Sequence, residues 1–220
     1  MFRKQYLDEQ RKVFDILVLA ETGVKDARDE IGWGADWKRS HTTYWASGPR
    51  TNKKGHTGTG MSVMIGNSIP VKEDKKLYED PEGRSIIIRL KIHNKDTILI
   101  GLHTDTHTTQ SHKESIERIE RALESITIHP ETTVILATDL NNYLTPHLDH
   151  MNSDGKPSAP HAHPEGREAI LRIASTLKLK DTFRELYPRK REFTHKCTTS
   201  KSRIDYLMTS EQLFNKKSIP

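Results

Sequence analysis

A short apolar run in the middle of the chain ends in an acid and an amide. The run is Val134-Ile135-Leu136-Ala137-Thr138, and Asp139-Leu140-Asn141 follow it. Its length and β-branched residues are typical of a buried strand. A carboxylate at the end of such a strand costs free energy unless it has a partner. Two interpretations stay open here: an Asx-type turn, or a metal or phosphate site at the carboxyl edge of an α/β sheet.

Other predicted strands also deliver a polar side chain. Near-continuous apolar runs are typical of strands covered on both faces, and alternating runs separated by a short turn predict a hairpin. Strand alternation puts Arg203 and Asp205 on the same face. The predicted strands are 14–20 ending in Glu21, 58–66, 84–92 paired with 97–103 ending in His103, and 202–208 carrying Asp205.

Helical periodicity lies between these strands, which favours an α/β arrangement. Ser111-His112-Lys113-Glu114 is a capping-box pattern at the start of one helix. The predicted helices are a short one within 1–12, one from Ser111 with Ile116, Ile119, Leu123 and Ile126 inward, and one at 168–179 with Ile170, Ile173 and Leu177 inward.

Three stretches lack periodicity. Residues 23–57 hold all three tryptophans and a basic stretch, and we expect an irregular loop whose tryptophans anchor it to the core. Residues 72–81 read as a charged turn region. Residues 145–164 hold four histidines, but their spacing matches no structural zinc pattern. We therefore expect a long surface loop at 145–164 that faces substrate or solvent.

Length and composition favour one domain over residues 1–220. The formal charge of +5 is compatible with a polyanionic partner such as nucleic acid. Cys197 is the only cysteine, which favours a reducing compartment. No apolar stretch approaches the roughly 18 residues of a transmembrane helix. We expect an intracellular protein, nuclear or cytoplasmic and not secreted, with no membrane contact and no obligate protein partner.

The polar strand ends form a candidate site if they converge. Glu21, Asp139 and Asp205 would then bring three carboxylates together, with His103 and Asn141 beside them. Like charges at such distances cannot all ionise without a counter-charge. Mg²⁺ is a suitable counter-charge, since it takes one or two carboxylates together with water and phosphate oxygens. Such an ion orients a water and neutralises charge on a phosphate.

The order of these pieces resembles the endonuclease/exonuclease/phosphatase superfamily, which has the deoxyribonuclease-like fold. Within it, the chain looks closest to the endonuclease domains of non-LTR retroelements and to apurinic endonucleases. The resemblance covers nearly the whole chain, except the loops at 23–57 and 145–164. Its pieces are Leu19 to Thr22, Gly58 to Met61, Gly83-Arg84, Leu99 to His103, Thr138 to Asn141, Asp181 to Arg184, Phe193-Thr194 and Ser202 to Leu207.

This resemblance implies a four-layer α/β sandwich, with two mixed β-sheets face to face and helices outside. It implies that Glu21 binds magnesium, and that Asp139 shares in the metal site and positions or deprotonates the attacking water. Asn141 would hold a phosphate oxygen, and Asp205 would orient a C-terminal histidine. His103 would hydrogen-bond the phosphate or protonate the leaving oxygen. The implied supporting residues are Thr138, Asp181, Arg184 and Arg203.

Two departures from the family pattern accompany the resemblance. The family's first strand, with its asparagine, should precede the first helix, and its Ser-Asp-His segment should follow Asp205; neither is found in the sequence. Thr138 also stands where glycine is usual, and Leu140 where phenylalanine is usual.

From the resemblance as a whole we expect a magnesium-dependent endonuclease that nicks DNA, with Mn²⁺ as an alternative ion. The alternatives are an inactive truncated domain that still binds nucleic acid, and a phosphatase or lipid phosphodiesterase of the same fold.

Overall fold

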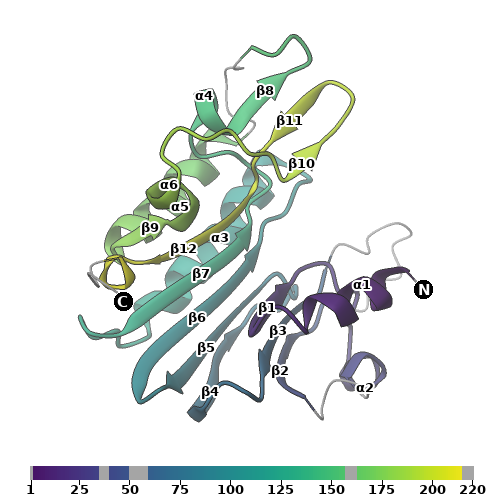
Figure 1. The fold of residues 1–220 in the computed structure, drawn as a ribbon, viewed down its shortest axis with the longest axis vertical. Helices are drawn as coiled ribbons and strands as arrows, with labels where there is room; N and C mark the ends of the chain where they lie inside the picture. Colours follow the sequence, from purple (N-terminus) through teal and green to yellow (C-terminus); the bar gives the residue numbers. More distant parts are fainter. Residues whose placement is uncertain (1, 35–39, 50–58, 157–162, 215–220) are drawn as a thin grey trace.

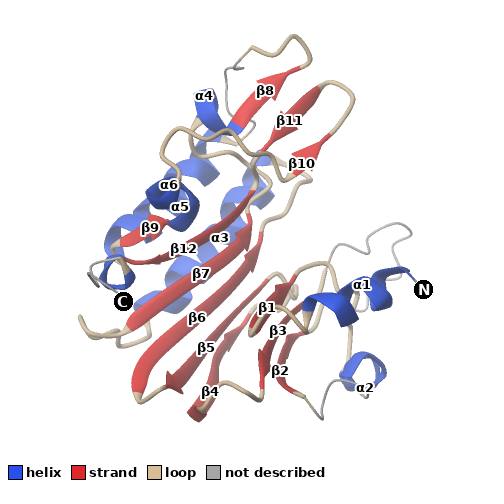
Figure 2. Ribbon diagram, in the orientation of Figure 1, coloured by secondary structure: helices blue, strands red, loops and turns tan. Residues whose placement is uncertain are grey.

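The computed structural model describes residues 2–34, 40–49, 59–156 and 163–214. Figures 1 and 2 show how its helices and strands are arranged. The helices are α1 (Phe2–Gln10), α2 (Ala27–Gly34), α3 (Thr109–Glu124), α4 (Pro146–Asp149), α5 (Pro164–Thr176), α6 (Thr182–Leu186) and the short 3-10 helix η1 (Glu211–Leu213). The strands are β1 (Ile16–Leu19), β2 (His41–Ala46), β3 (Met61–Gly66), β4 (Val71–Glu79), β5 (Ser85–Ile92), β6 (Lys95–His103), β7 (Thr133–Asp139), β8 (His150–Asn152), β9 (Leu179–Asp181), β10 (His195–Lys196), β11 (Ser200–Ser202) and β12 (Asp205–Ser210).

A six-stranded mixed sheet dominates the molecule, with strand order β4-β5-β6-β7-β12-β9. The predicted β5–β6 hairpin is confirmed, because Ser85 to Ile92 pair with Lys95 to Leu102 in continuous antiparallel register. Strands β6 and β7 are parallel, with α3 as the crossover between them. The parallel pair brings the carboxyl ends of both strands to the same edge of the sheet.

Both faces of this sheet are covered. On one face, α3 and α5 pack through Ile116, Ile119, Ile170 and Ile173 against the side chains of β5, β6, β7 and β12. On the other face, a second core joins Ile86, Ile88 and Leu90 of β5 and Leu99 of β6 to the small sheet. Burial on both faces explains the near-continuous apolar runs of the central strands.

The small sheet has order β1-β3-β2, and all its pairs are antiparallel. Leu7 of α1 packs with Leu17, Leu19 and Met64 on the outer side of this sheet. The layers are therefore helices, large sheet, small sheet and helix (Figure 1). This α/β sandwich agrees with the predicted fold class.

Several predicted elements need correction. The region at 23–57 is not irregular throughout, because it contains α2 and β2, and Trp45 is buried in β2. The basic stretch at 50–56 lies outside the described residues. Most of the region at 72–81 belongs to the edge strand β4 and is not a turn region. One side of this edge strand faces solvent, so its sequence is polar and gives no apolar strand pattern. The strand β1 was expected to be covered on both faces, but each of its residues is only half-buried.

Two helix boundaries also differ. Thr108, not Ser111, is the N-cap of α3, and the capping box joins Thr108 to Ser111 through their side chains and backbone. The helix predicted at 168–179 is α5, which begins at Pro164 and ends at Thr176, while Leu179 already belongs to β9. Proline is favourable in the first helical turn, because its missing N–H has no partner to lose there.

The segment 145–164 is not only a surface loop. It contains α4 and β8, and β8 pairs with β11 in a third sheet of order β10-β11-β8. Asp149, at the end of α4, is fully buried. None of the helices in the described residues is long and apolar enough to cross a lipid bilayer.

Candidate active site

Three strands of the large sheet bring their polar residues into one row. His103 of β6 lies opposite Asp139 of β7 in the parallel register. Asp205 of β12 lies opposite the same Asp139 in the antiparallel register. Directly paired residues of adjacent strands have their side chains ~5 Å apart on the same face. Asp139 is therefore flanked by an imidazole on one side and a carboxylate on the other.

Glu21 reaches this row from the small sheet. It follows β1 with a φ of +53°, a left-handed conformation that is unusual for a non-glycine residue. One oxygen of its carboxylate, Oε1, lies 3.8 Å from Nε2 of His103. The next residues are held in place by backbone hydrogen bonds, from Thr22 N–H to Gly60 O at 3.0 Å and from Gly23 N–H to Thr59 O at 2.9 Å. Strain of this kind persists where the surroundings fix it, and it is common at functional sites.

Asn141 completes the cluster through an Asx-type turn. Its φ is +48°, and its backbone N–H donates to Oδ1 of Asp139 at 3.2 Å. Its side-chain Nδ2 donates to the carbonyl of Thr104 at 3.1 Å. The two interpretations of this segment are thus compatible: Asp139 and Asn141 form a turn, and that turn lies within the group of carboxylates. One hydrogen of the Asn141 amide stays available for another acceptor.

The electrostatics of Asp139 are unusual. Burial is the main cause that raises the pKa of Asp139 to about 6, and the negative charges of Asp205 and Glu21 raise it further. The Asn141 N–H and the nearby His195 act in the opposite direction. In the described part of the chain, no lysine or arginine forms a salt bridge with these three carboxylates. The cluster therefore concentrates negative charge that a cation would neutralise.

His103 is buried and is held in its neutral form. Its exposed fraction is 4%, and burial lowers the pKa of His103, with Arg84 adding to the effect. Arg84 Nη1 lies 3.5 Å from its Nδ1, and Arg84 Nη2 pairs with Asp105 Oδ2 at 3.0 Å. A neutral imidazole donates a hydrogen bond from one ring nitrogen, but it is a poor proton donor to a leaving group.

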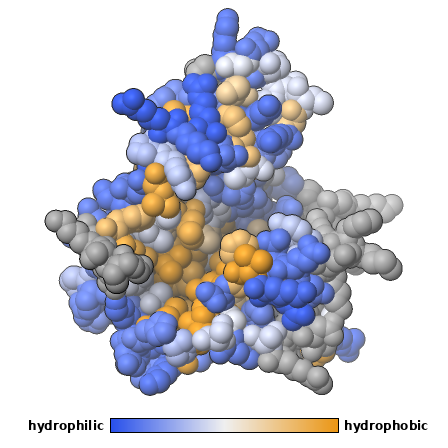
Figure 3. Space-filling model, viewed as in Figure 1, coloured by the Kyte–Doolittle hydropathy of each residue, from blue (hydrophilic) through white to orange (hydrophobic). Residues whose placement is uncertain are grey.

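A cavity of about 370 Å³ opens beside these residues, between the two sheets. Apolar side chains gather in this hollow, as the orange centre of the surface shows (Figure 3). The lining includes Val18, Ala20 and Met61 from the small-sheet side, and Leu102, Ala137, Asp139, Asp205 and Leu207 from the large sheet. The carboxylates thus lie next to a partly apolar recess, which strengthens electrostatic interactions there.

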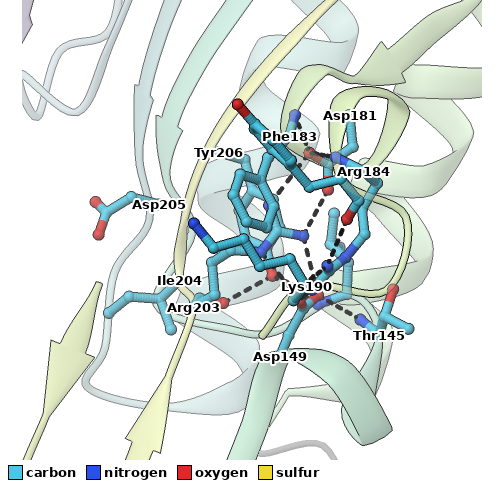
Figure 4. Close-up of polar contacts among 12 residues, drawn as sticks. Thr145, Asp149, Asp181, Phe183, Arg184, Lys190, Arg203, Ile204, Asp205 and Tyr206 are labelled. Carbon is cyan, nitrogen blue, oxygen red and sulfur yellow. Dashed lines mark hydrogen bonds and ion pairs between the residues drawn. The ribbon is translucent and has the colours of Figure 1, made fainter. Parts of the chain in front are cut away.

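The predicted relation between Arg203 and Asp205 is wrong. The strand is interrupted at Arg203 and Ile204, and β12 begins at Asp205. Arg203 is buried and points into a cluster with Asp149 and Asp181, whereas Asp205 is exposed and points away from that cluster (Figure 4). The interruption reverses the simple alternation of faces.

Asp149 and Arg203 form the centre of this second cluster. Arg203 Nε and Nη2 lie 2.9 and 3.2 Å from the Asp149 oxygens, and Arg203 Nη2 lies 2.6 Å from Asp181. Asp149 also pairs with Arg184 and accepts the backbone N–H of Thr145 at 2.9 Å (Figure 4). The guanidinium of Arg203 lies 4.3 Å above the ring of Tyr206. This cluster lies on the side of the chain away from the Asp205 side chain, and it holds the start of β12 in place (Figure 4).

The structure distributes the predicted supporting residues over two locations. Asp181, Arg184 and Arg203 belong to the cluster around Asp149. Asp181 is also the N-cap of α6 and accepts the N–H groups of Phe183 and Arg184. Thr138 is buried next to Asp139, and its hydroxyl has no hydrogen-bond partner among the described residues.

Sequence reasoning did not assign three residues that lie near His103 or Asp139. Arg84 contacts His103 and pairs with Asp105. His195 is close enough to lower the pKa of Asp139. Thr194, next to His195, accepts the N–H groups of Ile204 and Asp205. These residues come from two loops and from strand β10, and no spacing in the sequence connects them. The Arg84 position was noticeable only because Gly83-Arg84 belongs to the resembling pieces.

The cluster suits a hard divalent cation with few protein ligands. Among the described residues, no three His, Cys, Asp or Glu side chains are grouped closely enough to hold an ion together. Mg²⁺ needs fewer, since it usually keeps several waters and takes one or two carboxylates. The mutual repulsion of Asp139, Asp205 and Glu21 provides the electrostatic reason for a cation. Glu21, with its half-exposed carboxylate, and Asp139, whose pKa the Glu21 charge raises, are the candidate oxygen donors.

No protein-family model matches the sequence, and no curated protein resembles it significantly. Solved structures do resemble it. An AP endonuclease from Archaeoglobus fulgidus matches with a TM-score of 0.65 and 18% identity, over 95% of this chain and 80% of that one. The AP endonuclease of Leishmania major matches with a TM-score of 0.61 and 16% identity, over 93% and 72%. D. rerio TDP2, in complex with a single-strand DNA product, matches with a TM-score of 0.57 and 12% identity, over 96% and 77%.

Proposed function

We propose that this chain, which has the endonuclease/exonuclease/phosphatase-like fold, hydrolyses phosphodiester bonds at the cluster around Asp139. The observation that carries the proposal is the row His103–Asp139–Asp205 with Glu21 opposite it. Asp139 and Asp205 line the recess beside this row. Carboxylates that can hold a cation, next to an imidazole and an amide that can donate to a phosphate, suit in-line displacement at phosphorus. The substrate we propose is DNA, and the activity an endonucleolytic nick of the kind that retroelement endonucleases make.

Asp139 acts as the base in this proposal. Burial and the neighbouring negative charges raise its pKa to about 6 in the metal-free protein, so it is largely ionised and able to accept a proton above pH 6. Asp139 accepts a proton from a water molecule as the water oxygen attacks phosphorus. The bond from phosphorus to the leaving oxygen breaks, and solvent protonates that oxygen. Asp205, paired with Asp139 across the sheet, is one of the causes of the raised pKa of Asp139.

Asn141 and His103 hold the phosphate. The second hydrogen of the Asn141 amide donates to a non-bridging phosphate oxygen, while the first stays on the carbonyl of Thr104. His103 donates from its imidazole to another phosphate oxygen. Its lowered pKa favours this role over protonation of the leaving group. Arg84, fixed by Asp105, keeps the ring in position.

A divalent cation completes the proposal. Glu21 and Asp139 are its protein ligands, with Mg²⁺ as the expected ion and Mn²⁺ as the alternative. The cation supplies charge neutralisation at the phosphate when bound. The basic net charge of +5 supports a polyanionic substrate, and the Ser202 to Leu207 segment supports the likeness to retroelement endonucleases.

The test is nicking of supercoiled plasmid DNA with and without Mg²⁺. We expect conversion to the relaxed form that depends on Mg²⁺ and is lost in Asp139→Ala. Asp154→Ala is the matched control, because Asp154 is an exposed acid outside the site. Equal nicking by Asp139→Ala and the wild type would refute the assignment of the site. Mg²⁺-independent binding of DNA without cleavage by the wild type would favour the alternative of a non-catalytic nucleic-acid-binding domain.

A further inference from the structure

The peptide group between Leu140 and Asn141 connects the carboxylate of Asp139 to the buried interior. The N–H of this peptide donates to Asp139 Oδ1 at 3.2 Å. Its carbonyl, on Leu140, accepts two hydrogen bonds from side chains. Thr104 Oγ1 donates to it at 2.6 Å, and His112 Nε2 donates to it at 2.8 Å. Both side chains are fully buried. One peptide plane is thus held by two donors on one side and the site acid on the other.

The chemistry of His112 fixes the direction of its hydrogen bond. A carbonyl only accepts, so Nε2 must carry the proton and Nδ1 must be bare. Nδ1 is buried and has no hydrogen-bond partner among the described residues. Burial lowers the pKa of His112 to about 4, so the ring is neutral at physiological pH. A buried acceptor without a partner costs free energy, and the bond to Leu140 is the only described hydrogen bond of the ring that offsets it.

The surroundings of His112 keep its ring in one orientation. The ring of His163 stacks on it, with centroids 4.3 Å apart and planes inclined by 15°. A side chain at Gly166, in the first turns of α5, would place its Cβ 2.1 Å from Nδ1 of His112. The close approach of α5 therefore requires glycine at this position. The imidazole is packed between two helices, with Nε2 directed at the Leu140 carbonyl.

We propose that His112 and Thr104 are positioning residues for the site, acting through the Leu140–Asn141 peptide. The two donors fix the rotation of that peptide and aim its N–H at Asp139. They also stabilise the left-handed conformation of Asn141, whose φ is +48° and whose amide must reach the phosphate. Hydrogen bonds in series within a low-dielectric interior reinforce one another. Neither residue touches the substrate.

This inference rests on the proposed function, and three variants test it. Thr104→Val and His112→Leu each remove one hydrogen-bond donor and replace it with an apolar side chain of comparable size. His112→Gln can still donate from its side-chain amide. We expect kcat to fall about 10-fold in Thr104→Val and by about 10- to 30-fold in His112→Leu, as the loss of one buried hydrogen bond implies. KM should stay within about twofold, and His112→Gln should recover most of kcat.

A second measurement does not need activity. The backbone N–H of Asn141 should be protected from hydrogen exchange, and we expect about 10-fold faster exchange in Thr104→Val and His112→Leu. Ile119→Ala is the matched control, since Ile119 is buried on the same helix and has no polar link to the site. It should lose stability without losing kcat per folded molecule and without changing the exchange of Asn141 relative to its neighbours.

The outcomes separate the two claims. A wild type that does not cleave, but whose Asn141 exchange responds to both donor removals, would refute the proposed function and keep the positioning role. Unchanged exchange and unchanged kcat in Thr104→Val and His112→Leu would overturn the inference. A loss of kcat in Ile119→Ala equal to that in His112→Leu would also overturn it, because general destabilisation would then explain both.

Discussion

Two groups of acidic residues lie near β12, and they differ in whether arginine side chains pair with them. Asp149 and Asp181 are paired with Arg203, and Asp149 also with Arg184. Across the strand, Asp139 and Asp205 lie side by side with Glu21 nearby, and no described lysine or arginine pairs with them. The first group is electrostatically complete, as buried ion pairs in stable proteins are. The second has no cationic partner among the described lysines and arginines, which is what the proposed cation site would require. The first group therefore suits a structural role, and the second suits the catalytic role that we propose.

The largest expected effect lies in the incomplete group. Glu21→Gln keeps the shape of the side chain but removes the charge, so hydrolysis should fall by about 10²- to 10³-fold at fixed Mg²⁺. Stability should not fall, since no described arginine or lysine loses a partner. Steady-state cleavage of a duplex oligonucleotide and thermal unfolding of the same sample measure both quantities. Glu131→Gln, an exposed residue away from the site, is the control. Unaltered cleavage by Glu21→Gln would remove Glu21 from the site.

The next effect lies in the complete group. Asp149→Asn leaves Arg203 and Arg184 with one fewer buried counter-charge, which should lower the free energy of unfolding by about 3–5 kcal/mol. The Asp154→Asn control, at an exposed acid, should change it by less than about 0.5 kcal/mol. Chemical denaturation measures the difference. A change below about 1 kcal/mol in Asp149→Asn would mean that this cluster does not support β12.

A smaller effect is expected at the turn behind Glu21. Gly60 has a φ of +90°, and a Cβ there would lie 2.5 Å from Thr22 Oγ1 and 2.9 Å from Val24 N. Gly60→Ala should therefore cost about 2 kcal/mol of stability and lower cleavage by displacing the residues next to Glu21. The control is Gly155→Ala, because Gly155 has a φ of +73° but open space around it. Equal losses in both variants would show that only backbone conformation matters at Gly60.

The smallest effect concerns pH. The folded-state pKa of Asp139 is about 6, above an unfolded value near ~3.9. A raised carboxyl pKa means that the folded state binds more protons between these values, so stability falls as pH rises from about 4 to about 6. Asp139→Asn removes this cost. In EDTA, it should be more stable than the wild type by about 1–2 kcal/mol above pH 6, after discounting for partial exposure, and equal to it below pH 4.

The sequence predicted most of the strands that carry the candidate site. Strand-type runs that end in Glu21, His103 and Asp139 identified three of the polar strand ends, because apolar periodicity and a final polar residue are local signals. The β5–β6 hairpin followed from alternation and a short turn. The order of the resembling pieces then implied the sandwich that the structure contains.

Other features could not be predicted because they depend on distant parts of the chain. The pairing of Asp149 with Arg203 joins residues 54 positions apart. Because of this pairing, Arg203 does not share a face with Asp205, contrary to what the sequence had predicted. The link from His112 to Leu140 depends on one ring orientation between two helices. The edge strand β4 was missed since its exposed side is charged. Local patterns do not encode such contacts, which only tertiary packing creates.

Asp139→Asn tests the contrast between the two groups most directly. The measurement is single-turnover cleavage of duplex DNA as Mg²⁺ is titrated, with the unfolding free energy of the same preparation determined in EDTA at pH 7.5. We predict cleavage lost by at least about 10³-fold and stability equal to or above that of the wild type. Cleavage within about 10-fold of the wild type, or a variant clearly less stable than it, would contradict the account.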